Sequence, residues 1–272
     1  MRGKSPLDNL CWLPDAYMQL CVPQLEPSRS DLRPKLQFVG TFLGSNDTSP
    51  LPEWFRSFVV DGKTYGPLLM VTSGTIPGMD VSELIIPTSE ACRDLPVRLV
   101  VCAVHASKPE NYVLPDNVRW AEWISFDELF KYTDIAITNG GYGGIDQAFA
   151  NGIPMVLAGC VYEGHILYSL PQRSLTLLPL LCRLTEDKAE TTARAEMTGA
   201  AINLRTHTPT TEQVREAIKK MVGESKYKQR ALVLKQAYAE CDAVGSIVKE
   251  IHKQAESFYG NGRTGVIANG HA

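Results

Sequence analysis

A cluster of glycines between Asn139 and Gly144 is the part of this sequence best suited to bind an anion. Glycine occupies positions 140, 141, 143 and 144, directly after the short apolar run Ile135–Thr138. Apolar residues then recur at helical spacing, which predicts a helix that starts at this turn. The first amides of a helix have no partners inside it and carry a partial positive charge. Because glycines leave these amides uncovered, the turn could receive a phosphate group.

A plain turn is the competing interpretation of the same glycines. The segment does not match the GxGxxG fingerprint, because Asp146 stands where the third glycine would be. It does not match a GxxxxGK[ST] loop either. From spacing alone, a phosphate site and a ligand-free turn are equal alternatives.

The elements that must hold this turn are strands that alternate with helices. Each predicted strand is too apolar to have a face in water, which favours an α/β fold with a Rossmann-like parallel sheet and helices on both faces. We predict strands near 37–39, 68–71, 97–104, 118–123, 135–138, 154–157 and 200–204. We predict helices near 80–93, 126–132, 186–197, 210–221, 225–241 and 243–258, and one from the glycine turn to Gly152.

Three of these helices are expected to begin with a capping box. The predicted caps are Asp80 with Glu83, Ser125 with Glu128, and Thr210 with Gln213. Residues 43–66 are predicted to be a surface loop, because prolines and glycines interrupt them.

A second turn of small residues favours the phosphate interpretation. Thr72, Ser73, Gly74 and Thr75 follow the apolar run Leu68–Val71. The carboxyl ends of parallel strands lie at one edge of a sheet, and ligands of such folds bind there. Both small-residue turns are expected at that edge.

Composition sets limits on the class of protein. The chain has 272 residues, 44% of them hydrophobic and 21% charged, and a net charge of −3, which is typical of a globular protein and does not suggest nucleic-acid binding. No apolar run has the length of a membrane span and no secretory signal is evident, so we expect a cytoplasmic location. The seven cysteines are scattered without a CxxC pair, which indicates buried thiols. Cys102 and His105 have no second pair of ligands, and no metal is predicted.

Several segments occur in an order found in one enzyme family. They are TSGT, Trp123 before a helix, TDIAITNGGYGGIDQAFANGIPMVLAG, TEDKAE and GAAINL. Together, over about residues 36–258, they resemble the donor-binding half of UDP-dependent glycosyltransferases of the GT-B fold. The resemblance is to fungal and bacterial members, similar to the C-terminal domain of erythromycin glycosyltransferases. It implies a hexosyltransferase of secondary metabolism that moves a sugar from a UDP-sugar to a hydroxyl of a small lipophilic acceptor, without a cofactor or metal.

The resemblance also implies roles for individual residues. Trp123 would stack on uracil, with a core tryptophan as the alternative. The glycine segment and the Ser73 turn would hold the diphosphate, and Gln147 would bind the ribose where the family commonly has a carboxylate. Asp187 and Lys188 would contact the sugar, or simply form the charged first turn of a surface helix. The donor site predicted in this way is Ser73, Gly74, Thr75, Trp123, Asn139, Gly140, Gly141, Tyr142, Gly143, Gly144, Gln147, Asp187 and Lys188.

No catalytic base is expected in this chain, because in the family that histidine belongs to the N-terminal acceptor domain. We expect residues 1–66 to be a remnant of that domain with the interdomain linker, residues 67–258 to be the donor domain, and residues 259–272 to be a disordered tail. Residues 161–184 show neither the helical nor the strand periodicity of apolar residues and are interpreted as an insertion. The hypothesis for its origin is an unspliced intron or a gene-model error. A truncated product with little activity alone is therefore expected.

Two other functions remain open at this point. The chain could be a non-catalytic nucleotide-sugar binder, or a subunit that needs a separate acceptor domain. It could also be a sugar-nucleotide epimerase, which shares the two-domain architecture. An epimerase would need an acid and a base near the sugar, and only Asp187 is available in the sequence.

Overall fold

The computed structural model of this chain describes residues 14–27, 35–44, 47–74, 80–104, 106–159 and 188–260. The expected insertion at 161–184 and the tail from 261 lie outside these ranges, as do Thr75 and Asp187. The remaining residues of the expected donor site are described.

Six parallel strands form the main sheet. They are β3 (Leu68–Thr72), β4 (Arg98–Cys102), β5 (Val118–Ala121), β6 (Ile135–Thr138), β7 (Met155–Leu157) and β8 (Ala201–Asn203). Their spatial order is β5-β4-β3-β6-β7-β8, and every neighbouring pair is parallel. From the centre of the sheet, β3, β4 and β5 therefore follow one another outward to one edge, and β6, β7 and β8 follow one another outward to the other edge. This is the strand order of a doubly wound Rossmann sheet. The predicted fold class is confirmed.

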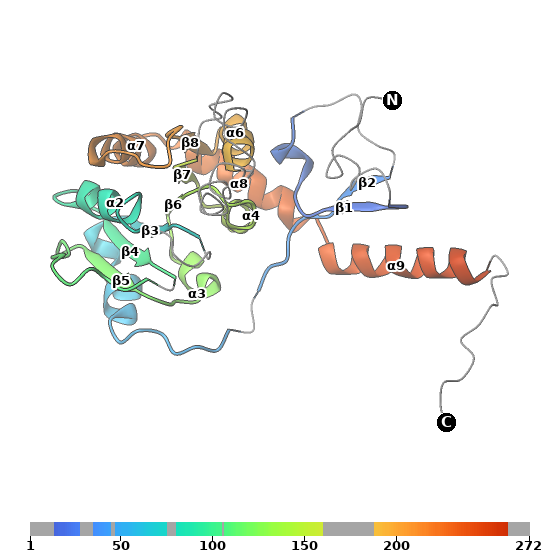
Figure 1. Cartoon of the computed structure of the whole chain (residues 1–272), viewed down its shortest axis with the longest axis horizontal. Helices are drawn as coiled ribbons and strands as arrows, with labels where there is room; N and C mark the ends of the chain where they lie inside the picture. Colours follow the sequence, from blue (N-terminus) through green and yellow to red (C-terminus); the bar gives the residue numbers. More distant parts are fainter. Residues whose placement is uncertain are drawn as a thin grey trace, which may run out of the picture.

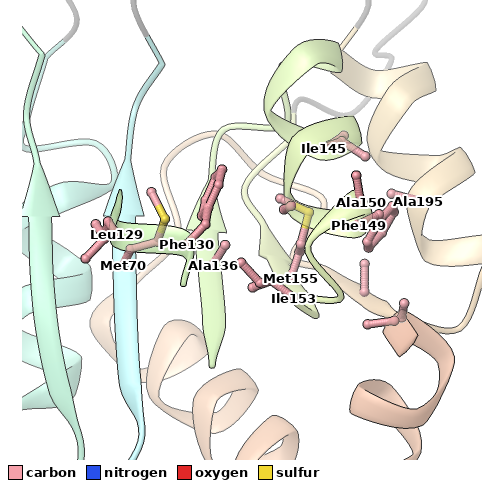
Figure 2. Close-up of a cluster of buried hydrophobic side chains, with 14 of the residues drawn as sticks. Met70, Leu129, Phe130, Ala136, Ile145, Phe149, Ala150, Ile153, Met155 and Ala195 are labelled. Carbon is pink, nitrogen blue, oxygen red and sulfur yellow. The ribbon is translucent and has the colours of Figure 1, made fainter. Parts of the chain in front are cut away.

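Helices cover both faces of this sheet because its central strands are apolar on both sides. All five residues of β3 are buried; Leu68 and Met70 belong to one core cluster and Leu69 and Val71 to the other. The first cluster includes residues of α3 (Phe126–Phe130), α4 (Tyr142–Ala150), α6 (Lys188–Met197) and α8 (Lys226–Ala239). The second includes residues of α2 (Ile85–Cys92) and α7 (Thr211–Gly223). Figure 2 shows the first cluster around Phe149 and Met155, between the sheet and α4.

The N-terminal part adds a second, smaller sheet. β1 (Tyr17–Gln19) pairs in parallel with β2 (Leu36–Phe38), apart from the main sheet. The turn η1 (Pro23–Leu25) follows β1, and Cys21, Val22 and Leu25 are buried in the core that contains α4 and α8. Residues 21–25 therefore pack against the main domain, although β1 and β2 form a separate sheet.

The prediction of a loop at residues 43–66 is wrong for its second half. Two short helical turns occupy it, η2 (Arg56–Val60) and η3 (Asp61–Tyr65). Phe55 and Val59 are buried against the first face of the sheet, and this burial stabilises the turns despite the nearby prolines and glycines. The extended chain that precedes them links the small sheet to the main one (Figure 1).

Only one of the three predicted caps is confirmed. Thr210 and Gln213 form a complete capping box at the start of α7. Ser125 occupies the N-cap of α3, but its side chain makes no capping hydrogen bond. α2 begins at Ile85 rather than near Asp80, whose Oδ1 instead accepts a hydrogen bond of 2.8 Å from Ser82 N in the preceding turn.

The last helix, α9 (Ala243–Gly260), extends away from the main sheet on the side of β1 and β2 (Figure 1). Gln37 Nε2 donates a hydrogen bond of 3.5 Å to Glu250 Oε2 and so links β2 to this helix. α9 exposes the apolar side chains of Val244, Val248, Ile251, Phe258 and Tyr259. Among the described helices, none has both the length and the apolar character needed to cross a membrane.

Candidate functional site

A cavity of about 540 Å³ opens at the carboxyl ends of β3 and β6. This is the point where the strand order reverses, and ligands of doubly wound sheets bind there. The volume is in the range of small-molecule sites. Its described lining comprises Phe42, Gly44, Asp47, Thr72, Ser73, Gly74, Val104, Trp123, Ile124, Phe126, Asp127, Thr138, Asn139, Gly141, Tyr142, Gly143, Gly144, Gln147 and Lys188.

The glycine turn presents the start of α4 to this cavity. Gly141 is the N-cap residue, and α4 begins at Tyr142. A Cβ atom built on Gly141, Gly143 or Gly144 would meet no protein atom within 4 Å. Packing therefore does not require these three glycines, which line the cavity together with Tyr142. The first amides of a helix have no partner within it, so this end of α4 is suited to an anion.

The turn after β3 lies opposite and is tied to the glycine turn by Asn139. The Nδ2 atom of Asn139 donates a hydrogen bond to the backbone carbonyl of Ser73. Asn139 was expected to contact the ligand. In the structure its side chain also has another role, because it joins the two turns. Ser73 Oγ is buried at the cavity and has no hydrogen-bond partner among the described residues. A buried hydroxyl without a partner is costly, so this atom marks a position where a ligand would be bound.

Trp123 is a wall of the cavity and not a core residue. It follows β5, 52% of its surface is exposed, and its Nε1 donates a hydrogen bond of 3.2 Å to Asp47 Oδ2. The alternative of a buried tryptophan is therefore wrong.

The segment before η2 also contributes to the cavity, although the sequence did not assign it to the site. It supplies Phe42, Gly44 and Asp47. Hydrogen bonds lower the pKa of the Asp47 carboxyl and keep it ionised. Those from Ser49 have the larger effect, and the one from Trp123 has a smaller effect.

Helix α6 closes another side of the cavity. Lys188 and Gln147, two of the residues expected at the donor site, line it. Thr191 Oγ1 donates a hydrogen bond of 2.7 Å to the carbonyl of Gly140. A Cβ on Gly140 would lie only 2.1 Å from Thr192 Cγ2, so this glycine allows α6 to approach the turn. Thr191 and Thr192 escaped the sequence analysis because nothing in their spacing differs from an ordinary helix.

Asp146 lies behind the cavity, on the buried side of α4. Its side chain is 1% exposed, and its Oδ1 accepts a hydrogen bond from the hydroxyl of Tyr238 on α8. Burial raises the pKa of this carboxyl to about 7, against a smaller lowering by the Tyr238 hydrogen bond. The charge of Glu26 raises it further. Asp146 therefore holds a proton in the folded protein up to about neutral pH.

The raised pKa of Asp146 predicts that stability falls as pH rises. The folded state binds this proton more tightly than the unfolded state, whose pKa is near 3.8, so the favourable contribution is lost between that value and about 7. We expect Asp146→Asn to exceed the wild type in free energy of unfolding by a larger margin at pH 8 than at pH 5, because more of this contribution is lost at the higher pH. Urea denaturation of both proteins at the two pH values measures this. Equal pH dependence in the two proteins would contradict it.

Thiols and metal ligands offer no second site in the part of the chain that is described. Cys21, Cys92 and Cys102 are buried free thiols, as predicted, and Cys241 is a partly exposed one. Groups of three His, Cys, Asp or Glu side chains able to hold a metal are absent from the ranges that the structure covers.

Comparison with known proteins gives similar sequences but no matching family model. The chain is 38% identical over 256 residues to UDP-glycosyltransferase 2 of Phaeomoniella chlamydospora, covering 92% of this chain and 50% of that protein. It is 36% identical to the UDP-glucosyltransferase avaP of Aspergillus versicolor, over 86% of this chain and 46% of that one. It is 30% identical to the 4'-demethylrebeccamycin synthase of Lentzea aerocolonigenes, over 89% and 50%. The chain spans about half the length of these relatives.

Solved structures with a similar fold are glycosyltransferases. The calicheamicin glycosyltransferase CalG4 has a TM-score of 0.66 at 18% identity, over 92% of this chain and 54% of that one. The glycotransferase of kitacinnamycin has a TM-score of 0.68 at 20% identity, over 90% and 56%. The spinosyn rhamnosyltransferase SpnG, complexed with thymidine diphosphate, has a TM-score of 0.64 at 19% identity, over 88% and 57%. The fold is that of one half of a GT-B glycosyltransferase.

Proposed function

We propose that this chain is the donor-binding half of a UDP-dependent glycosyltransferase, and that it moves a hexose from a UDP-sugar to a hydroxyl of a small lipophilic acceptor. One observation carries the proposal. The start of α4 and Ser73, whose Oγ has no hydrogen-bond partner among the described residues, line the same cavity. A diphosphate has the charge and the acceptor oxygens to satisfy both groups at once.

The residues of the cavity divide into three parts in this proposal. The indole of Trp123 stacks on the uracil ring, and Gln147 bonds the ribose hydroxyls through its amide, which can donate and accept. The amides of 141–144 with Ser73 Oγ hold the diphosphate. Lys188 reaches the sugar end, and we propose the same role for Asp187 and a diphosphate contact for Thr75, both outside the described residues.

The reaction needs stabilisation of a leaving diphosphate. As the acceptor oxygen forms its bond to the anomeric carbon, the bond from that carbon to the β-phosphate oxygen breaks, and the configuration inverts. The electron pair goes to the diphosphate, where the helix amides stabilise the added charge without a metal or cofactor. The acceptor proton goes to a base in the acceptor-binding half, where the resemblance places the family's histidine.

The acceptor-binding half is the partner that this proposal requires. The relatives are about twice as long as this chain, and the exposed apolar side chains of α9 offer a surface on which such a half could pack. We propose residues 1–66 as a remnant of that half with the linker, and residues 67–258 as the donor domain. The cytoplasmic location predicted from the sequence remains a prediction.

A nucleotide-sugar binder without activity is the second candidate. It would use the same glycine turn and Ser73 at the cavity, since donor binding needs no further residue. An epimerase is less well supported. The cavity does hold two further carboxylates, Asp47 and Asp127, but Asp47 is bonded to Trp123 at the proposed uracil end.

Calorimetry with UDP and UDP-glucose tests the proposal on the 272-residue chain. Binding of both supports it, and absence of binding at millimolar UDP would overturn both the transferase and the binder. Product analysis with a sterol or phenolic acceptor then separates these two. The chain alone is expected to give little turnover, with activity returning when an acceptor-binding half is supplied.

Replacing Trp123 with alanine is expected to weaken UDP binding by about tenfold or more, because base stacking on an aromatic side chain contributes about 1–3 kcal/mol. Uridine should lose affinity by the same factor, since the stacking does not involve the phosphates. Titration calorimetry measures both. Tyr65→Ala is the matched control, because Tyr65 is exposed and does not line the cavity. Unchanged affinity of Trp123→Ala would place the base elsewhere.

A further inference from the structure

A chain of polar contacts joins the N-terminal segment 17–26 to the buried side of the donor cavity. Tyr142 is the first residue of α4, and its hydroxyl accepts a hydrogen bond from Gln19 Nε2. The same hydroxyl is hydrogen-bonded to the thiol of Cys21. The side chain of Tyr142 therefore reaches the small N-terminal sheet, while its backbone belongs to the glycine turn that borders the cavity.

The same segment also holds the neighbouring helix. Arg194 of α6 forms an ion pair with Glu26, and both side chains are largely buried, at 22% and 12% exposed. Arg194 pairs with Glu190 on its own helix as well. The start of α6 is in turn bonded to the glycine turn through Thr191 and Gly140. Both helices that border the turn are thus tied to residues 19–26.

These contacts restrain the orientation of the backbone amides at the start of α4. The amide of a first helical residue has no partner within the helix, so the first turn of α4 depends on other contacts for its orientation. Donors that bind a charged group must be held to within a fraction of an ångström. A hydrogen bond on the side chain of the first residue is a direct way to fix this turn.

We propose that Tyr142 is a positioning residue for the diphosphate, and that segment 17–26 is part of the donor site through it. This inference rests on the proposed function. Tyr142 acts through its hydroxyl on the orientation of the amides and does not itself need to touch the ligand with its side chain. The N-terminal segment then sets phosphate affinity while leaving the nucleoside end of the cavity unchanged.

The contacts that the Tyr142 hydroxyl makes with Gln19 and Cys21 are between neutral groups at ordinary pH. Burial raises the pKa of the Cys21 thiol to about 12 and raises the pKa of Tyr142 as well. The charged or titratable groups that face this cluster are Glu26, Asp146, Arg194 and Tyr238. The Tyr142 hydroxyl does not titrate between pH 6 and 9, but Asp146 beside it loses its proton near pH 7, so the variants are to be compared at one pH.

Tyr142→Phe tests the inference, because it removes the hydroxyl and keeps the ring. In the full chain we expect UDP affinity to fall about fivefold, the usual size for one lost hydrogen bond, while uridine affinity stays unchanged. Gln19→Ala should produce the same split, and the double variant should lose less than the product of the two single losses. Tyr112→Phe is the matched control; its hydroxyl bonds to Glu90, and it does not line the cavity.

The outcomes separate this inference from the proposed function. If the wild-type chain fails to bind UDP, the proposed function fails and the inference with it. If the wild type binds UDP and Tyr142→Phe binds it equally well, the inference alone is overturned. Equal losses for UDP and uridine would also overturn it, because they would indicate a general structural effect. Thermal denaturation of each variant shows that the folded protein is being compared.

Discussion

Replacing Gly141 with aspartate is expected to lower UDP affinity by about 100-fold or more, since hydrogen bonds from amides to a charged group contribute about 1.5–3 kcal/mol each. Gly141 is the N-cap of α4, and a Cβ atom there meets no protein atom within 4 Å. The new carboxylate can therefore enter the cavity and accept the hydrogen bonds that would go to the diphosphate. It also repels the negative charge of the ligand.

The same substitution should leave the fold intact, which makes it a sharp test. Aspartate is among the preferred N-cap residues, so the melting temperature is expected to stay the same or to rise slightly. Gly141→Asn is the matched control, because it has the same shape without the charge and should weaken UDP binding less. Calorimetry and thermal denaturation of both variants measure the two effects. Undiminished UDP binding by Gly141→Asp would show that the diphosphate lies elsewhere.

Gly140→Ala is expected to destabilise the fold by about 2–5 kcal/mol, the sum of a left-handed backbone cost and an overpacked contact. Gly140 has a φ of +87°, and its Cβ would lie 2.1 Å from Thr192 Cγ2. Either the turn or α6 must move to admit the methyl group. Urea denaturation measures the loss in free energy of unfolding.

Two companion variants separate the contributions to this loss. Thr192→Ser removes Cγ2 but keeps a hydroxyl that can bond to the carbonyl of Lys188, so in the Gly140→Ala background it should recover part of the stability. Gly144→Ala should instead stabilise α4 by about 0.5–1 kcal/mol, because its Cβ meets nothing and alanine favours helix. A destabilisation of equal size at Gly140 and Gly144 would contradict this account.

The sequence predicted the central sheet well because each strand had to be buried on both faces. β3 and β6 were found to within a residue, since an apolar run that ends in small polar residues has few other structures open to it. The start of α2 was missed although Pro87 signals it. A helix that began near Asp80 would place this proline in its interior, whereas a start at Ile85 leaves it in the first turn, where it is tolerated.

Parts of the candidate site could not be predicted because they depend on contacts between distant residues. Spacing drew attention to the glycine turn, and the resemblance to Trp123, Gln147 and Lys188. All of these line the cavity except Gly140, which packs against Thr192. Asp47 belongs to a segment without periodicity, and only the fold brings it to Trp123. Local spacing likewise carries no information on the contact between Gln19 and Tyr142, which are 123 positions apart.

The pairing of β3 with β6 has a consequence for how this protein folds. Val71 lies beside Ile137, so closing that ladder joins residues far apart along the chain, whereas β4 can pair with β5 over a much shorter stretch. Ladders of high sequence separation raise the contact order and form slowly. Recovery of nucleotide affinity after dilution from denaturant would therefore report on the last stage of assembly, when the two halves of the sheet come together.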